Sequence, residues 1–444
     1  MKEAGFTRGD YICMENQKLI RKLLIYMKGS NSEYDVYNHT EYSSLKQRLI
    51  NEGYNFYPNY GNKVWYQGIL SEIHRDDLEL SYYDYSGNTE YITDHYDAVL
   101  MPCANIFSEE FVDKLIKNTE FIRKVKIPVF VISCGIQLGQ TESVDNLIRK
   151  IGKESSEFID AVYQNGGDIC LRGYITKDFF DKLGFDFAFV GGCPSIYQRG
   201  RNLKIDKKNV SASEFKVAVN GHNTELKTKL YRDIFRQYPE SEFFDQDEYG
   251  EYLYTPDFLS DNSIKKIIQH VRKNGNMGCN LLFQGKINYF ADVDDWIGYI
   301  AENNFSMAFG SRIHGNIVPI LSGVPGVVNS CDSRTREIAQ FYDIPCYTTK
   351  EIEEFKDLYD LYEKIDYSTF NKTYISKFEE FEKFLRKCKL VDEINEKNIF
   401  GISTKVNKTI VNENDIYKMR NKYMRMKPLY WFIDKSLNIY HGIK

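Results

Sequence analysis

The sequence lacks the cysteine patterns of a disulfide framework or a zinc site. Its nine cysteines are odd in number, are scattered along 444 residues and include no C-x-x-C pair. Closely spaced pairs mark zinc sites, and an even set in a short chain marks a disulfide framework. We therefore expect most of these cysteines to be small buried residues, and we expect no metal site and no resident cofactor.

Long apolar runs and an excess of positive charge are also missing. No segment approaches the roughly 20 apolar residues that span a bilayer, and the N-terminus, MKEAGFTRGDYICMENQKLI, has no secretory pattern. The chain has 58 basic and 63 acidic residues and a formal net charge of −5. We expect a cytoplasmic protein that does not have nucleic acid as a main partner.

The sequence contains neither G-x-G-x-x-G nor a Walker motif. Two glycine-bearing turns, NYGNKVWYQG and SCGIQLG, are weak phosphate-loop signals that more often mark tight turns. Hydrophobic residues make up 42% and aromatic residues 15% of the chain, a composition typical of a globular protein. A length of 444 residues favours two domains, each with its own core.

Apolar and amphipathic segments alternate along the chain and predict two α/β units. YDAVLMP, IPVFVIS and DICLR resemble buried strands in the first unit, and FKVAVNG, NLLFQG, FSMAFG and PGVVNS in the second. This pattern is typical of parallel sheets covered on both faces. We predict an N-terminal extension at 1–54 with a helix in ENQKLIRKLLIYM, Rossmann-like domains at 55–200 and 213–350, a linker at 201–212 and a helical C-terminal extension at 351–444.

The segment GSRIHGN is the strongest candidate site, because it lies where a predicted strand turns into a helix. Helix N-termini favour anions, Ser311 and Arg312 add donors, and Gly310 and Gly315 would let a ligand approach closely. The positive helix end would disfavour the cationic form of His314, as suits a general acid or base. The spacing is equally compatible with a histidine that caps a turn and an arginine paired at the surface.

Other polar residues fall at the predicted carboxyl ends of strands, where ligands bind in parallel sheets. Asp332 precedes a predicted helix and is also interpretable as its N-cap. The remaining candidates of this kind are Arg172, Asn220, His222, Gln284, Arg334 and Arg336.

Two longer segments resemble the polysaccharide pyruvyl transferase family. GSRIHGNIVPILSGVPGVVNSCDSRTREIAQFYDIP is similar to that family's S-x-R-h-H segment with its apolar helix and following basic residue. ICLRGYITKDFFDKLGFDFAFVGGCPSIY resembles its arginine-bearing strand and Thr-containing helix, and NYGNKVWYQGI is a looser match. The sequence departs from the family at LMPCANIFS, where a glycine-rich turn is common, and at Cys193-Pro194, where Asp-Pro is common.

The resemblance implies a fold like that of the B-type glycosyltransferases, with two domains facing a central cleft. It also implies transfer of pyruvate from phosphoenolpyruvate to two hydroxyls of a sugar in a surface polysaccharide or its precursor, with release of phosphate. Under this hypothesis phosphoenolpyruvate is a co-substrate, Arg172 and Arg312 hold it, Arg334 or Arg336 supports it, and His314 transfers the proton.

Two alternatives remain at this stage, a glycosyltransferase of the same architecture that uses a sugar nucleotide and a non-catalytic sugar-binding or assembly protein. The carrier of the acceptor, lipid or nucleotide, and the oligomeric state, including a homo-oligomer, are also open. The C-terminal segment KYMRMKPLYWFIDKSLNIY mixes basic and aromatic residues. That composition suits a peripheral contact with an anionic membrane, or packing against a domain or second subunit.

Overall fold

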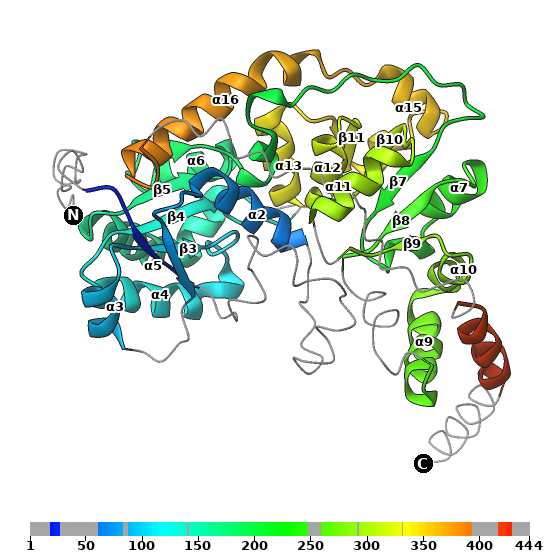
Figure 1. Cartoon of the computed structure of the whole chain (residues 1–444), viewed down its shortest axis with the longest axis horizontal. Helices are drawn as coiled ribbons and strands as arrows, with labels where there is room; N and C mark the ends of the chain where they lie inside the picture. Colours follow the sequence, from blue (N-terminus) through cyan, green and yellow to red (C-terminus); the bar gives the residue numbers. More distant parts are fainter. Residues whose placement is uncertain are drawn as a thin grey trace.

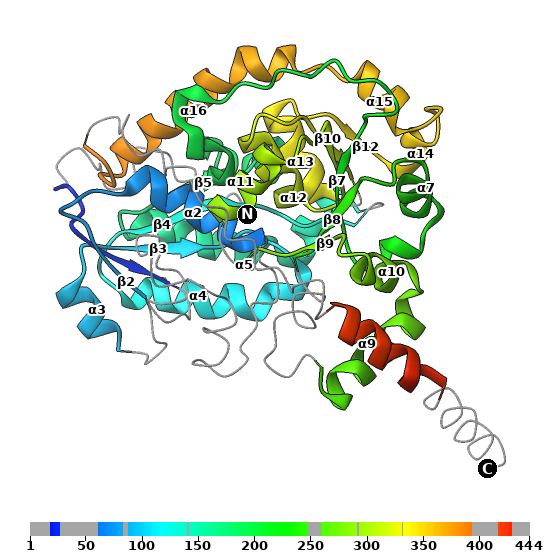
Figure 2. The same cartoon turned by 45° about the vertical axis from the view of Figure 1, so that its right-hand side comes forward.

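The fold consists of two parallel six-stranded sheets, each flanked by helices (Figure 1). The computed structural model describes residues 18–26, 61–82, 88–139, 142–246, 259–290, 293–330, 332–392 and 416–428. The two sheets belong to two domains that lie side by side (Figures 1 and 2). The predicted α/β class with two Rossmann-like domains and a helical C-terminal part is confirmed.

The first sheet has the order β2-β1-β3-β4-β5-β6 with all pairs parallel. Its chain order reverses between β1 and β3, and ligands collect outside such a reversal at the carboxyl ends of the strands. The strands are β1 (Lys22–Ile25), β2 (Glu79–Tyr82), β3 (Ala98–Pro102), β4 (Val129–Cys134), β5 (Asp168–Leu171) and β6 (Phe189–Val190). The helices are α2 (Gly61–Ile73), α3 (Thr89–His95), η3 (Glu109–Phe111), α4 (Val112–Lys124), α5 (Val144–Gln164), α6 (Tyr174–Lys182) and η4 (Pro194–Asn202).

Both faces of the first sheet are buried, which explains why its strands are continuously apolar. On β3, Val99 and Met101 join the apolar cluster that includes residues of α4 and α5. The alternate residues Ala98 and Leu100 join a second cluster with α2 and η4. Successive side chains of a strand point to opposite faces, so a run with no polar position indicates cover on both sides.

The second sheet has the order β12-β11-β10-β7-β8-β9, also parallel throughout. Its order reverses between β7 and β10, as in a dinucleotide-binding fold. The strands are β7 (Val217–Asn220), β8 (Glu242–Phe244), β9 (Ile287–Asn288), β10 (Met307–Gly310), β11 (Gly326–Asn329) and β12 (Cys346–Tyr347). The helices are η5 (Glu225–Lys227), α7 (Lys229–Gln237), α9 (Asp261–Asn274), α10 (Met277–Phe283), α11 (Val293–Glu302), α12 (Ile313–Leu321) and α13 (Ser333–Tyr342).

The chain returns to the first domain after the second sheet. Helices α14 (Thr349–Ile352) and α15 (Leu358–Lys364) follow β12, and α16 (Ser368–Lys387) then runs back across the top of Figure 1. Phe384 of α16 stacks on Phe189 of β6 with ring centroids 5.0 Å apart. Lys387 at the end of α16 pairs with Asp168 of β5.

Two predicted elements are wrong. Part of the expected N-terminal extension is β1, a strand in the interior of the first sheet, and not a helix. NLLFQG is the end of helix α10 and not a strand, so Gln284 caps that helix. Short apolar runs of this length fit either structure, and pairing with distant chain decides between them.

Candidate functional site

A cavity of about 410 Å³ lies between the two domains, at the carboxyl ends of both sheets. The first domain lines it with residues that follow β1 and β3, with the end of β4 and with residues of α2 and α4, among them Tyr26, Cys103, Ser133, Trp65 and Lys114. The second domain lines it with residues that follow β7, β8, β10 and β11, among them His222, Gln246, Arg312, His314 and Arg334. The cavity thus joins the order reversals of the two sheets, where a ligand is expected.

The segment GSRIHG reaches this cavity because two glycines let it pack on Asn220. A Cβ on Gly310 would fall 1.8 Å from the Asn220 carbonyl oxygen, and one on Gly315 would fall 2.5 Å from the Asn220 side chain. The Asn220 side-chain oxygen accepts the Arg312 backbone N–H at 3.0 Å. The glycines therefore admit Asn220 of the neighbouring strand, and not the ligand that we expected.

Arg312 is the N-cap residue of α12 and lines the cavity. Its Nη2 donates to His222 Nδ1 at 3.0 Å. The preceding Ser311 donates its hydroxyl to Glu225 Oε2 at 2.5 Å, and burial raises the pKa of that carboxyl group. Ser311 therefore secures the turn, and Arg312 presents its positive charge at the cavity wall.

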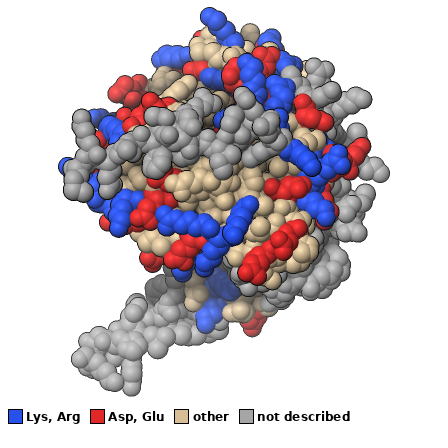
Figure 3. Space-filling model, turned by 90° about the vertical axis from the view of Figure 1, so that its left-hand side faces the viewer, with Lys and Arg blue, Asp and Glu red and all other residues tan. Residues whose placement is uncertain are grey.

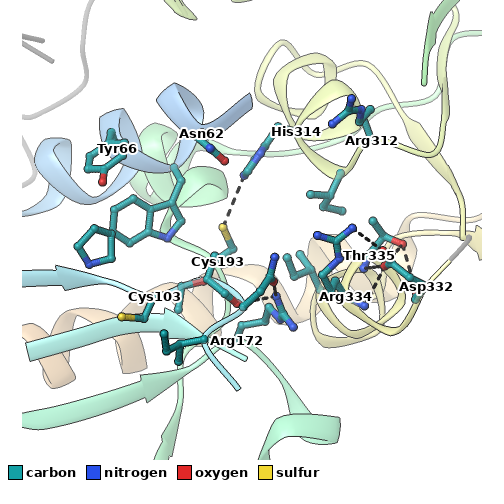
Figure 4. A pocket seen from close by; sticks show the side chains of 18 of the residues that line it. Asn62, Tyr66, Cys103, Arg172, Cys193, Arg312, His314, Asp332, Arg334 and Thr335 are labelled. Carbon is teal, nitrogen blue, oxygen red and sulfur yellow. Dashed lines mark hydrogen bonds and ion pairs between the residues drawn. The ribbon is translucent and has the colours of Figure 1, made fainter. Parts of the chain in front are cut away.

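His314 stands in the first turn of α12 and lines the cavity. Figure 4 shows its ring directed at Cys193 of the first domain, and the distance from Nε2 to Sγ is 4.0 Å. Burial, aided by the Arg312 charge, lowers its pKa from 6.5 to about 4. The cationic form is disfavoured, as expected, but the causes are burial and Arg312. The imidazole is therefore neutral at pH 7.

Arg334 adds a second guanidinium to the same wall, where its Nη2 pairs with Asp332 Oδ2 at 2.6 Å. Asp332 is the N-cap of α13, as one of our two interpretations held, and its Oδ1 accepts the backbone N–H groups of Arg334 and Thr335. Its Oδ2 accepts from Arg334 Nε at 2.8 Å, and these contacts hold the Asp332 pKa low despite burial. The cap thus fixes the position of the Arg334 guanidinium at the cavity (Figure 4).

Arg172 lies at the base of the cavity, but its donors are already used by the protein. Its Nε donates to Glu337 of α13 in the second domain at 2.9 Å, and both side chains are buried. Its Nη1 donates to Ala104 and Asn105, and its Nη2 donates to Ile136. The expected role of Arg172 in holding a ligand anion is not what this geometry favours, because its guanidinium joins the two domains.

The other residues that we predicted for the site, Asn220, Arg336 and Gln284, do not contact the cavity directly. Asn220 is buried behind Arg312, where it supports the turn. Arg336 and Gln284 are exposed and are not among the residues that line the cavity. Arg336 is exposed although its neighbour Glu337 is buried, since consecutive side chains of a helix point about 100° apart. Its charge lies near Glu351 and Cys346.

Sequence reasoning missed most of the first-domain wall. Asn62, Trp65 and Tyr66 lie in the NYGNKVWYQG segment, which we interpreted as a weak phosphate-loop signal that more often marks a tight turn. They line the cavity from helix α2. Lys114 and Asn118 are four residues apart on α4, a spacing that places them on one helix face. That spacing was visible in the sequence, but nothing in it indicated that this face meets a cavity.

Comparisons with known proteins give one clear result. The family model described as "Polysaccharide pyruvyl transferase" matches residues 17–333, more than half of the chain and including β1. The solved structure titled "Crystal structure of UDP-N-acetylglucosamine 2-epimerase" is similar at 10% identity and a TM-score of 0.37, over 85% of this chain and 98% of that one. No protein with a curated description matches significantly.

Proposed function

Since the chain belongs to the polysaccharide pyruvyl transferase family, we propose that it transfers pyruvate as a ketal from phosphoenolpyruvate to a sugar of a surface polysaccharide or its precursor. The observation that carries the proposal is the second-domain wall of the cavity, which Arg312, His314 and Arg334 line. Phosphoenolpyruvate has a carboxylate and a phosphate, and two arginines match two anionic groups. The proposal needs no resident cofactor, because phosphate is already a leaving group.

The reaction requires balanced proton transfers. The first acceptor hydroxyl adds to C2 of phosphoenolpyruvate, and its proton is transferred to the methylene carbon, which becomes a methyl group. The C2–O bond to phosphate then breaks, and a second hydroxyl adds and loses its proton. One proton ends on the new methyl group and one on the released phosphate. A titratable group beside C2 is therefore needed.

We assign this proton transfer to His314. Its neutral imidazole can accept a proton from an acceptor hydroxyl, and the resulting imidazolium can donate to the methylene carbon. A bound anion beside Arg312 would offset the repulsion that lowers the His314 pKa, so binding of phosphoenolpyruvate would bring that pKa closer to neutral.

The test measures phosphate release from phosphoenolpyruvate with and without candidate sugar acceptors. Release that depends on acceptor, with a pyruvate ketal detected by mass spectrometry, supports the proposal. His314→Ala is expected to lower turnover by at least 100-fold while keeping the wild-type circular dichroism spectrum. Gln284→Ala, an exposed candidate outside the cavity, is the matched control and is expected to keep full activity.

The alternatives give different outcomes in the same assay. Transfer only from sugar nucleotides would indicate a glycosyltransferase and overturn the proposal. Ligand-dependent stabilisation without any turnover would indicate a sugar-binding or assembly protein. Wild-type turnover of His314→Ala would remove His314 from the mechanism.

We also propose a peripheral contact with an anionic membrane through the C-terminal segment KYMRMKPLYWFIDKSLNIY, which would place the enzyme at the inner face of the cell membrane. The structure describes the start of this segment in a helix at residues 416–428, and the remainder lies outside the described residues. On the face shown in Figure 3, basic and acidic side chains are interspersed, whereas this helix has five basic and no acidic residues. Its inner face packs on α10 through Tyr423 and Phe283, and Tyr417 and Met424 are exposed. Among the described helices, none is long and apolar enough to cross a membrane.

A further inference from the structure

The first-domain wall of the cavity differs chemically from the second-domain wall. Trp65 and Tyr66 of α2 line it, and both rings are at least nine-tenths buried. Their ring centroids are 4.9 Å apart with the rings nearly perpendicular. Aromatic faces of this kind pack against the apolar C–H face of a sugar ring, whereas the arginine wall opposite suits a small anion.

Three nitrogen atoms of residues that line the cavity are buried and have no hydrogen-bond partner. They are Trp65 Nε1, Asn118 Nδ2 and Gln246 Nε2, and the residues are 7%, 3% and 2% exposed. Buried polar groups are normally paired, so unpaired donors in residues that line a cavity are available to a ligand that supplies acceptors. All three are donors. A ligand that pairs with them presents acceptor oxygens, as hydroxyl and phosphate groups do.

Lys114 adds a positive charge to the same helix face as Asn118. It is exposed yet lines the cavity, so it lies at the rim, and Asn118 lies one turn further along α4 in the interior. The described residues place no acidic group in an ion pair with Lys114. An ammonium group at the rim above buried neutral donors suits a ligand that is neutral inside and anionic outside.

We propose that this wall is the acceptor subsite and that it takes a sugar joined to phosphate or diphosphate. The sugar ring packs on Trp65 and Tyr66, its oxygens accept from Trp65 Nε1 and Asn118 Nδ2, and its phosphate pairs with Lys114. The role of this sugar as the acceptor rests on the proposed pyruvyl transfer, whereas binding of a sugar phosphate to this wall does not depend on that reaction. Phosphoenolpyruvate on the arginine wall would then face the sugar hydroxyls across the cavity, with His314 beside both.

Binding is tested by tryptophan fluorescence with sugar 1-phosphates as probes. Glucose 1-phosphate, N-acetylglucosamine 1-phosphate and mannose 1-phosphate are titrated against the intact protein, beside the same free sugars. We expect at least one sugar phosphate to quench fluorescence and to bind at least ten times more tightly than its free sugar. Trp65→Phe should abolish the quench. Trp296→Phe should retain it, because Trp296 is in a ring stack with Phe244 and Phe290 in the second domain.

Lys114→Ala is expected to weaken binding of that sugar phosphate about tenfold and to leave binding of the free sugar and of phosphoenolpyruvate unchanged. Lys117→Ala is the matched control, because Lys117 is exposed on the same helix but does not line the cavity. Equal affinity for sugar and sugar phosphate, or an unchanged affinity in Lys114→Ala, would overturn the inference. If sugar phosphates bind as expected but phosphoenolpyruvate is never consumed, the proposed function fails and the subsite stands.

Discussion

Removing the Glu337 carboxylate should destabilise the protein strongly. Glu337 accepts hydrogen bonds from Arg172 Nε, Thr176 N and Thr176 Oγ1, at 2.9, 2.5 and 3.0 Å. The Arg172 and Glu337 side chains are 3% and 0% exposed. Glu337→Leu would therefore leave one buried positive charge and two buried hydroxyl or amide donors without an acceptor.

The packing leaves little room for water to replace the carboxylate. A Cβ on Gly135 would fall 2.3 Å from Arg172 Nε, and one on Gly173 would fall 2.3 Å from Glu337 Cγ. Breaking a buried pair by removing one partner costs about 3–5 kcal/mol, and we expect Glu337→Leu to lose that much free energy of unfolding. The double variant Arg172→Met with Glu337→Leu should lose less than the sum of the single variants, by about 1–3 kcal/mol.

Urea unfolding followed by far-UV circular dichroism measures both quantities. Asp145→Asn is the control, because Asp145 forms an exposed ion pair with Lys182 and should cost less than about 1 kcal/mol. A loss below about 1 kcal/mol for Glu337→Leu, or strict additivity of the two single variants, would refute the assignment of this pair as a buried link between the domains.

Three further predictions concern the site and the C-terminal helix. The pKa of His314 falls from 6.5 in the unfolded chain to about 4 in the folded one, so the folded state binds this proton less well. The free energy of unfolding should therefore be highest above pH 6.5 and should decrease by about 3 kcal/mol as the pH falls to 4. In urea unfolding His314→Gln should therefore lose less stability over that range than the wild type, and parallel pH profiles would contradict this. Gly310→Ala should destabilise by at least about 2 kcal/mol in the same assay, because its Cβ meets the Asn220 carbonyl, whereas Gly139→Ala, in open space, should be neutral. The full chain should sediment with anionic but not with neutral liposomes at low salt, and glutamate at Lys418, Arg420 and Arg425 should release it; equal sedimentation of the variant would reject the membrane contact.

The fold class was predictable because the signals that carry it are local. Strands β3, β4, β7 and β10 are short apolar runs between amphipathic helices, and this pattern alone predicts parallel sheets. Strand β1 was not predictable, because its apolar residues follow a helix-like stretch and only pairing with β2 and β3 makes it a strand. The family match, which begins at residue 17, includes this strand.

The second-domain wall of the candidate site was predictable from the sequence for a similar reason. The sequence of residues 310–315 predicts a strand-to-helix junction without any long-range information, and such junctions in parallel sheets commonly bind ligands. The role of Arg172 could not be predicted, because its partner is 165 residues away in another domain. The first-domain wall of the cavity could not be predicted either. Trp65 lies on helix α2, and this helix lines a cavity only because the second domain lies opposite it.

Helix α16 has a consequence for whether the two domains can be separated. The chain crosses between the domains once after η4 and again before α16, and Lys389 beyond α16 accepts the Ile20 backbone N–H next to β1. The two domains also share one continuous apolar cluster, which includes Leu23 and Val64 of the first domain and Val217 and Ile317 of the second. A fragment that ends in the first crossing would lack α16, and it would expose Phe189 and Tyr197 of the first domain, which stack on Phe384 and Phe381 of that helix.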